Sequence, residues 1–182
     1  MPRLSLSSVA GALLPSAILA TVTVATASLV MAALPAHAQT LTQQNISVAQ
    51  AMAVVEGAIE SCGRDGDLVT VTVAVVDRAG QPRVMVAADN SNPHNLDLAR
   101  RKAYTALTFR RTSLNWVART ADGTPRAGQR QMVDVIALGG GVPIMIGDDP
   151  IGAVGVSGAP GGQPADDACA MAGVEAIADQ LR

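Results

Sequence analysis

The sequence predicts an α+β domain with an antiparallel sheet, preceded by an N-terminal secretion signal. Two stretches rich in β-branched residues, 69–88 and 142–157, are each interrupted by a short turn, which is typical of β-hairpins. Segments with helical periodicity precede, separate and follow these hairpins. Strands joined by hairpins run antiparallel, so this order favours the α+β class over a doubly wound parallel sheet.

The first 38 residues have the three parts of a cleavable signal peptide. Arg3 gives a positive start, residues 9–34 are apolar, and residues 36–38 form a small-x-small cleavage site. The apolar stretch is long enough for a retained membrane anchor to be the alternative. We favour cleavage after residue 38, because Pro35 would end a helix. We therefore expect a periplasmic or secreted domain at 39–182, with no membrane association after cleavage.

The charge balance bears on the class of partner. The chain has 13 basic and 15 acidic residues and a net charge of −2 at pH 7. Proteins that bind nucleic acid usually carry a basic surplus, so we expect no nucleic-acid partner. The length of the mature chain suits one domain with a real hydrophobic core.

The N-terminal half of the mature chain contains a helix and a hairpin. Apolar residues recur at helical spacing over 48–62, with Ser47 as a favourable N-cap and Gly63 as a stop. A turn is expected at 65–67. The hairpin follows, with strands at 69–76 and 82–88 joined by a turn at 77–80.

The C-terminal half contains the remaining helices and the second hairpin. Asp97 near its start supports a helix over 96–109, and Asp166 and Asp167 open the last helix, which is expected to reach Leu181. The other predicted elements are a short helix at 114–117, a polar and mobile loop at 120–130, and strands at 142–146 and 151–157.

The chain contains two cysteines, Cys62 and Cys169, and both belong to the mature domain. Cysteines of exported proteins are usually oxidised when geometry allows. Cys62 closes the first predicted helix and Cys169 lies in the first turns of the last, so antiparallel packing of these helices would bring the two residues together. We predict a disulfide between them, with two buried free thiols as the alternative.

Aromatic and basic residues cluster after the one histidine that signal cleavage would leave, His94. The three aromatic residues of the chain follow it closely, and cations are interleaved with them. A flat apolar ligand with carboxylate arms would find stacking and charge partners there. Haem fits this description, with His94 as a candidate axial ligand and an arginine for a propionate. The aromatic residues are Tyr104, Phe109 and Trp116, and the cations are Arg100, Arg101, Lys102, Arg110 and Arg111.

Simpler interpretations of the same residues remain open. Aromatic residues on an amphipathic helix are more often part of the core, and the basic run 100–102 is typical of a solvated face or an oligomer contact. Ser157 lacks the second glycine of a nucleophile elbow, and a single histidine does not make a zinc triad. The residues identify no catalytic set, which favours a binding protein over an enzyme.

Five segments in order resemble the GlcG/HbpS-like family of bacterial proteins. The resemblance covers roughly residues 41–182 and implies a profilin-like fold, in which helices cover a central antiparallel sheet of about five strands. The segments are 73–80, 99–106, 140–144, 151–158 and 166–170.

The resemblance implies a haem or other tetrapyrrole ligand and self-association into a homo-oligomer, since an exported relative is an octameric haem-binding accessory of a redox sensor. His94 and Thr105 are the candidates for the iron ligand, with Tyr104 behind them. The other candidate haem contacts are Arg100, Arg101 and Phe109. An alternative is a binding protein or small enzyme for an organic acid whose carboxylate is held by Arg100 and Arg101.

Overall fold

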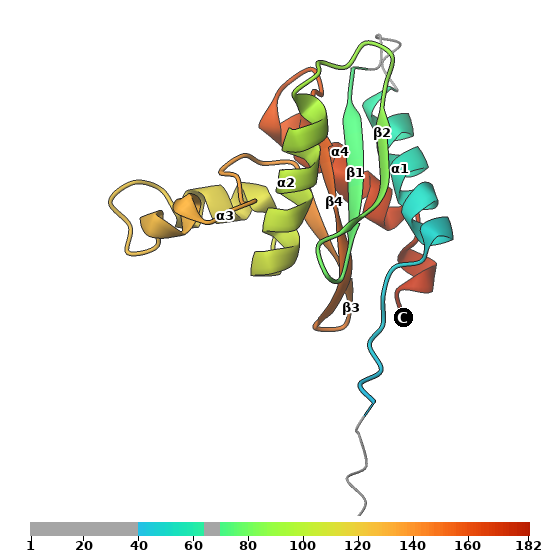
Figure 1. Ribbon diagram of the computed structural model, residues 1–182. Coiled ribbons are helices and arrows are strands. Elements are labelled where there is room, and N and C mark those ends of the chain that lie inside the picture. Colours follow the sequence, from blue (N-terminus) through green and yellow to red (C-terminus); the bar gives the residue numbers. More distant parts are fainter. Residues whose placement is uncertain (1–39, 64–69) are drawn as a thin grey trace, which may run out of the picture. The chain divides into compact units, whose positions relative to one another are not determined.

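The computed structural model describes residues 40–63 and 70–182, and the unit that begins at Leu41 is built on a four-stranded antiparallel sheet (Figure 1). The strands lie in the order β2-β1-β4-β3. The helices are α1 (Val48–Cys62), α2 (Asn95–Phe109), α3 (Ser113–Arg119) and α4 (Gln163–Glu175), with 3₁₀ helices η1 (Ala127–Gln131) and η2 (Ala178–Gln180). The strands are β1 (Thr72–Asp77), β2 (Pro82–Ala87), β3 (Gly141–Ile146) and β4 (Asp149–Ser157).

Helices cover both faces of the sheet, which confirms the predicted fold class. The main core lies between α1, α4 and one face of the sheet, whereas α2 packs on the opposite face (Figure 1). The strand count differs from the expectation, because the described residues form four strands rather than about five.

The central strand β1 is buried on both faces. Val73 and Val75 face the α1 and α4 side, and Val76 faces α2. Thr72 is 0% exposed as well. A strand with neighbours on both edges and helices on both faces has no solvent side.

The predicted helix ends are confirmed at α1 and corrected at α4. Ser47 forms a capping box with Gln50, and Gly63 follows the last residue of α1. The last helix starts at Gln163, before Asp166, and its α-helical part ends at Glu175 rather than near residue 181. The turn predicted at 65–67 lies outside the described residues.

The predicted disulfide between Cys62 and Cys169 is confirmed, and it joins α1 to α4. Small residues let these antiparallel helices approach closely. A Cβ atom on Gly57 would lie 2.8 Å from the Cβ of Ala176, and one on Gly173 would lie 2.6 Å from the carbonyl oxygen of Val54. The packing therefore needs glycine at both positions.

A segment projects from the body of the domain between α2 and β3. It comprises residues 113–131, and we call it the arm (Figure 1). The loop predicted at 120–130 is partly ordered as η1. Among the described residues, no helix has the length and hydropathy needed to span a membrane.

Candidate functional site

Most of the sequence-predicted binding residues lie along α2 rather than around one point. His94 precedes the helix, Tyr104 lies within it and Phe109 ends it. Because an α-helix rises about 1.5 Å per residue, Phe109 lies roughly 22 Å along the axis from His94. The structure therefore does not bring these three side chains together.

His94 occupies the N-cap position of α2, and its side chain is exposed and makes no capping hydrogen bond. A neutral imidazole is a common metal ligand. This donor is thus open to a ligand that approaches the protein surface.

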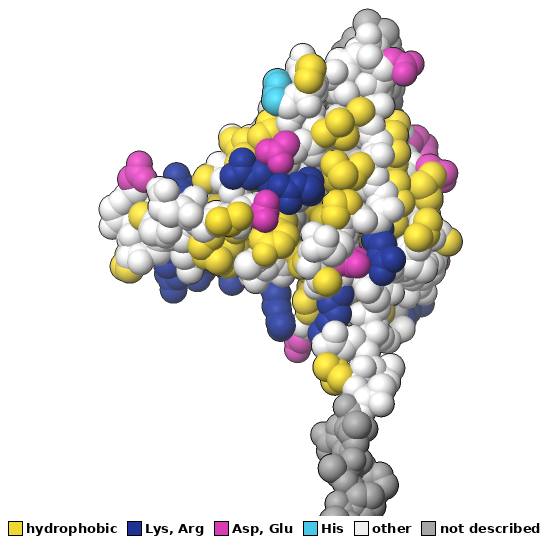
Figure 2. All heavy atoms as spheres, in the orientation of Figure 1, with side chains coloured by type: hydrophobic (Ala, Val, Ile, Leu, Met, Phe, Trp, Pro, Cys, Tyr) yellow, Lys and Arg dark blue, Asp and Glu magenta, His cyan; other side chains and the backbone are white. Residues whose placement is uncertain are grey.

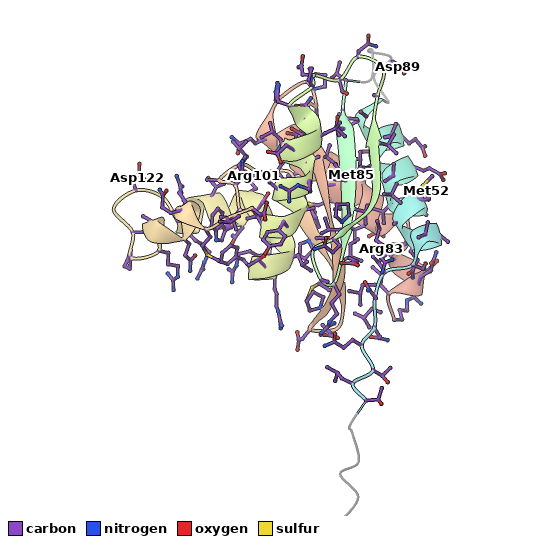
Figure 3. All side chains as sticks on the ribbon, viewed as in Figure 1. Met52, Arg83, Met85, Asp89, Arg101 and Asp122 are labelled. Atoms are coloured by element: carbon purple, nitrogen blue, oxygen red, sulfur yellow. A yellow bond between two sulfur atoms is a disulfide. The ribbon has the colours of Figure 1, made fainter. Side chains whose placement is uncertain are left out.

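Arg100 and Arg101 are already engaged by acidic and carbonyl groups. Nη2 of Arg100 lies 2.8 Å from Oδ1 of Asp134 and 3.1 Å from Oδ1 of Asp97, and the hydrogen bond to Asp134 is the main reason that the pKa of Arg100 is raised. Arg101, which Figure 3 marks on α2, donates to the carbonyl oxygen of Val135 at 2.7 Å. A ligand carboxylate at these guanidinium groups would compete with existing partners.

Thr105 connects α2 to the segment that leads into β3. Its hydroxyl group donates to the carbonyl oxygen of Arg101 at 2.8 Å and accepts from the backbone N–H of Ile136 at 2.9 Å. The residue is 0% exposed. In this conformation the hydroxyl group has no open side for a ligand.

Tyr104 lines a cavity of about 280 Å³ with Arg78 and Arg110. Gly80, with φ of +77°, makes room for the ring, because a Cβ atom there would lie 2.7 Å from it. Arg78 forms a two-pronged ion pair with Asp149 at 2.7 and 2.8 Å, and this hydrogen bonding lowers the pKa of Asp149. Sites that enclose a drug-sized ligand usually exceed about 300 Å³, so a porphyrin would lie against this surface rather than inside it.

Lys102 lies in the core, so the solvated face expected for residues 100–102 is wrong at this position. It is 2% exposed, and its Nζ atom lies 2.7 Å from Oδ2 of Asp166 and 3.0 Å from the carbonyl oxygen of Val156. A signal was present in the sequence, because Lys102 shares the helical face of three alanines. These are Ala99, Ala103 and Ala106.

Ser157 belongs to the same buried cluster and is 2% exposed. Its hydroxyl group lies 3.4 Å from Nζ of Lys102 and donates to Oδ1 of Asn95 at 3.3 Å. Its place in the core fits a structural serine. Within the described ranges, no three or more His, Cys, Asp or Glu residues are grouped so as to hold a metal ion.

Phe109 and Trp116 stack on each other with ring centroids 4.8 Å apart. Beside them is a hollow of about 120 Å³ whose lining includes Arg111, Arg119 and Arg126. The sequence grouped the two rings with Arg111. It gave no signal for Arg126, because the segment of Arg126 has no helical periodicity. Arg119 follows Trp116 at the i+3 spacing, but the short helix predicted at 114–117 ended before it.

Comparison with known proteins gives a family match over most of the domain. The model of the family described as "Haem degrading protein HbpS-like" matches residues 46–175. An uncharacterised 15.0 kDa protein from the dhaT–dhaS intergenic region of Citrobacter freundii is 32% identical over 92 residues. That alignment covers 50% of this chain and 65% of the relative, so it spans less than two-thirds of the relative's length.

Solved structures with the same fold include HbpS of Streptomyces reticuli, determined as a double mutant. It is 31% identical, with a TM-score of 0.69 over 80% of this chain and 98% of that one. A complex of PduOC with haem is 23% identical, with a TM-score of 0.66 over 73% of this chain and 95% of that one. The second likeness shows the fold alone.

Proposed function

The chain belongs to the HbpS-like family, and on this basis we propose that it is an exported haem-binding protein. The observation that carries the proposal is the family match across 46–175, which includes all of α2. The PduOC complex supports it in one respect, because a domain of the same fold has been solved with haem. Bound haem would supply a redox-active iron, which suits a redox or sensor accessory.

His94 is the proposed axial ligand. Its exposed imidazole needs no rearrangement of the core to meet a porphyrin at the surface. Tyr104 is the second candidate, since it lines the cavity beside Arg110. Thr105 is third, because ligation through its hydroxyl group would break two hydrogen bonds. Arg100 and Arg101 remain the proposed porphyrin contacts on the same helix. Phe109 lies roughly 22 Å along the axis from His94, so it would be a porphyrin contact only if Tyr104 held the iron.

Titration of the haem-free protein with hemin tests the proposal. We expect a saturable shift of the Soret band that is lost in His94→Ala and retained in Tyr104→Phe. Asn92→Ala is a matched control, because Asn92 is an exposed residue of the same loop. No Soret shift in the wild type would refute haem binding, whereas a shift that survives His94→Ala and disappears in Tyr104→Phe would reassign the ligand.

A second candidate function is binding or conversion of an organic acid held by Arg100 and Arg101. It is the weaker proposal, because Asp134 and Asp97 already engage these side chains. Thermal stabilisation by small acids that is lost in Arg100→Gln, in a protein with no hemin response, would favour it over haem binding.

A further inference from the structure

The hollow between α2 and the arm is a cationic site that shares only Phe109 with the proposed haem contacts. It is lined by both stacked rings, Phe109 and Trp116, and by Gln129, in addition to Arg111, Arg119 and Arg126. Its volume of about 120 Å³ suits a small ion or one end of a larger molecule. The three arginines are contributed by three different segments, so the fold rather than the local sequence brings them together.

The end of α2 determines where Arg111 lies at the edge of the hollow. Arg110 follows the helix in the left-handed conformation with φ of 51°, which turns the chain sharply. Thr112 then caps α3 by accepting a hydrogen bond from the N–H of Asn115. Nε of Arg111 donates to the carbonyl oxygen of Phe109 at 3.1 Å, which fixes this guanidinium group beside the rings.

The arm supplies the other walls. Arg119 lies three residues after Trp116 on α3, so both side chains share one helical face. The return segment is held against α3 by Arg130, which donates to the carbonyl oxygen of Val117 at 2.9 Å and to the hydroxyl oxygen of Thr120 at 3.2 Å. These bonds hold the segment that carries Arg126 beside the hollow.

Positive charge in this region is not balanced by acidic side chains. Within the part of the chain that the structure describes, no Asp or Glu lines the hollow, and Asp122 is the one acidic residue between residues 110 and 131. Figure 3 shows Asp122 at the far tip of the arm, and Figure 2 shows Lys and Arg side chains gathered along one side of the arm. An anion in the hollow would therefore be attracted by the positive potential of the three arginines, which no acidic lining residue reduces.

Trp116 also brings a buried polar group to the wall of the hollow. Trp116 is 2% exposed, and its Nε1–H has no hydrogen-bond partner among the described residues. Buried donors are nearly always paired, and an unpaired one costs about 1–3 kcal/mol. The Nε1 atom is itself buried, so an acceptor in the hollow would reach it only if the ring or its neighbours shifted.

We infer that this hollow binds the oxyanion of a small, multiply charged acid, such as a tricarboxylate or inorganic phosphate. Guanidinium groups match carboxylate and phosphate oxygens in planar, two-pronged geometry. The stacked rings exclude water on one side, which strengthens the attraction of the arginines for the anion. The inference does not depend on haem binding.

The test measures thermal unfolding and calorimetric titration of the haem-free protein with citrate, inorganic phosphate and acetate, with sodium chloride matched for ionic strength. We expect citrate or phosphate to raise Tm by about 5–10 °C at 100 times Kd, with little effect of acetate. Arg119→Gln and Arg126→Gln should each weaken binding at least about tenfold, the cost of one charge-assisted hydrogen bond. Both arginines are exposed, so these variants should keep the far-ultraviolet circular dichroism of the wild type.

Arg182→Gln is the matched control, because it removes one exposed arginine outside the hollow. Equal stabilisation by chloride, or equal weakening in Arg182→Gln, would overturn the inference by showing a general salt effect. Hemin titration of the same variants identifies the source of the oxyanion. Weaker hemin binding in Arg119→Gln would assign the site to a porphyrin carboxylate, and unchanged hemin binding with lost citrate binding would assign it to a free acid.

Discussion

At the scale of single residues, the Lys102–Asp166 pair is the main polar link across the core. The side chains are 3% and 6% exposed, and Oδ1 of Asp166 also accepts a hydrogen bond from the N–H of Ala159 at 2.8 Å. The pair joins α2 to α4, with β4 supplying the carbonyl oxygen of Val156. The net contribution of such a pair to stability depends on its geometry, because the cost of desolvating both charges offsets their attraction.

Removal of one partner should lower the free energy of unfolding by far more than the intact pair contributes to it. Lys102→Met would leave the Asp166 carboxylate buried without its cation, and we expect the free energy of unfolding to fall by about 3–5 kcal/mol in urea denaturation. The control is Arg182→Met, whose partner Asp179 is 91% exposed, and its effect should stay within about 0.5 kcal/mol. Similar small effects in both variants would show that the core pair is not buried as described.

Asp167 gives a prediction of pH dependence. Burial raises the pKa of this carboxyl, the N–H of Gly140 opposes that shift, Asp166 adds to it and Lys102 opposes it. The folded protein therefore binds this proton more tightly than the unfolded chain does. The contribution of the carboxyl to stability is greatest below its unfolded pKa of about 3.9 and is lost as pH rises through the higher folded value.

Asp167→Asn should consequently stabilise the protein at pH 7, because the amide oxygen can still accept from Gly140 without a buried charge. The gain should shrink as pH falls toward about 4. Urea denaturation at several pH values measures it, with the exposed Asp148→Asn as control. A gain that stayed constant with pH would contradict the raised pKa.

At the scale of elements, the sequence predicted those boundaries that are set by hydrogen bonds between residues close together in the chain. The Ser47 cap fixed the start of α1, and the turn at 77–80 fixed the first hairpin, because Oδ1 of Asp77 accepts from the N–H groups of Ala79 and Gln81. The start of α4 was missed, since Pro164 lies in its first turn and reads equally well as loop. The distance between α2 and the sheet could not be predicted from the sequence, because it depends on which strand glycines lie against the helix backbone in the folded protein.

Gly155 shows this dependence and provides a test. A Cβ atom on this residue of β4 would collide with the carbonyl oxygen of Ala99 on α2. Gly155→Ala should therefore lower the free energy of unfolding by about 1–3 kcal/mol, the usual cost of an overpacked core. In Gly128→Ala, the control, the new methyl group meets nothing within 4 Å and should leave stability nearly unchanged. Equal stability of the two variants would mean that α2 does not rest on this glycine.

At the scale of the whole molecule, the fold class and the disulfide were predictable from sequence, but the grouping of the site residues was not. Residues 94–116 cluster along the chain, yet α2 spreads them along its axis and the arm carries Trp116 to Phe109. The ion pairs that occupy Arg100 and Arg101 form partly with Asp134, 34 residues away from Arg100. Assembly into a homo-oligomer, which the family resemblance implies, remains a proposal that light scattering of the purified protein can test.

Export and disulfide formation should be linked in the whole protein. We expect the chain, expressed with its predicted leader (residues 1–38) in a bacterium that has a periplasm, to be recovered from that compartment with Gln39 as its first residue. Intact-mass spectrometry would show this start together with the loss of two hydrogen masses from the bonded Cys62 and Cys169. Recovery in the membrane fraction with the leader attached would instead identify a tethered domain.

The disulfide should contribute strongly to stability, because it joins residues 107 positions apart. Closing so long a loop constrains the unfolded chain, and loss of such a bridge typically costs about 2–5 kcal/mol. The Cys62→Ala/Cys169→Ala double variant and the wild type treated with a reductant should therefore lose similar amounts of unfolding free energy, while the double variant should not respond to the reductant. If reduction left the wild type unchanged, α1 and α4 would be held by their glycine-mediated contact alone, and an oxidising compartment would not be needed for this fold.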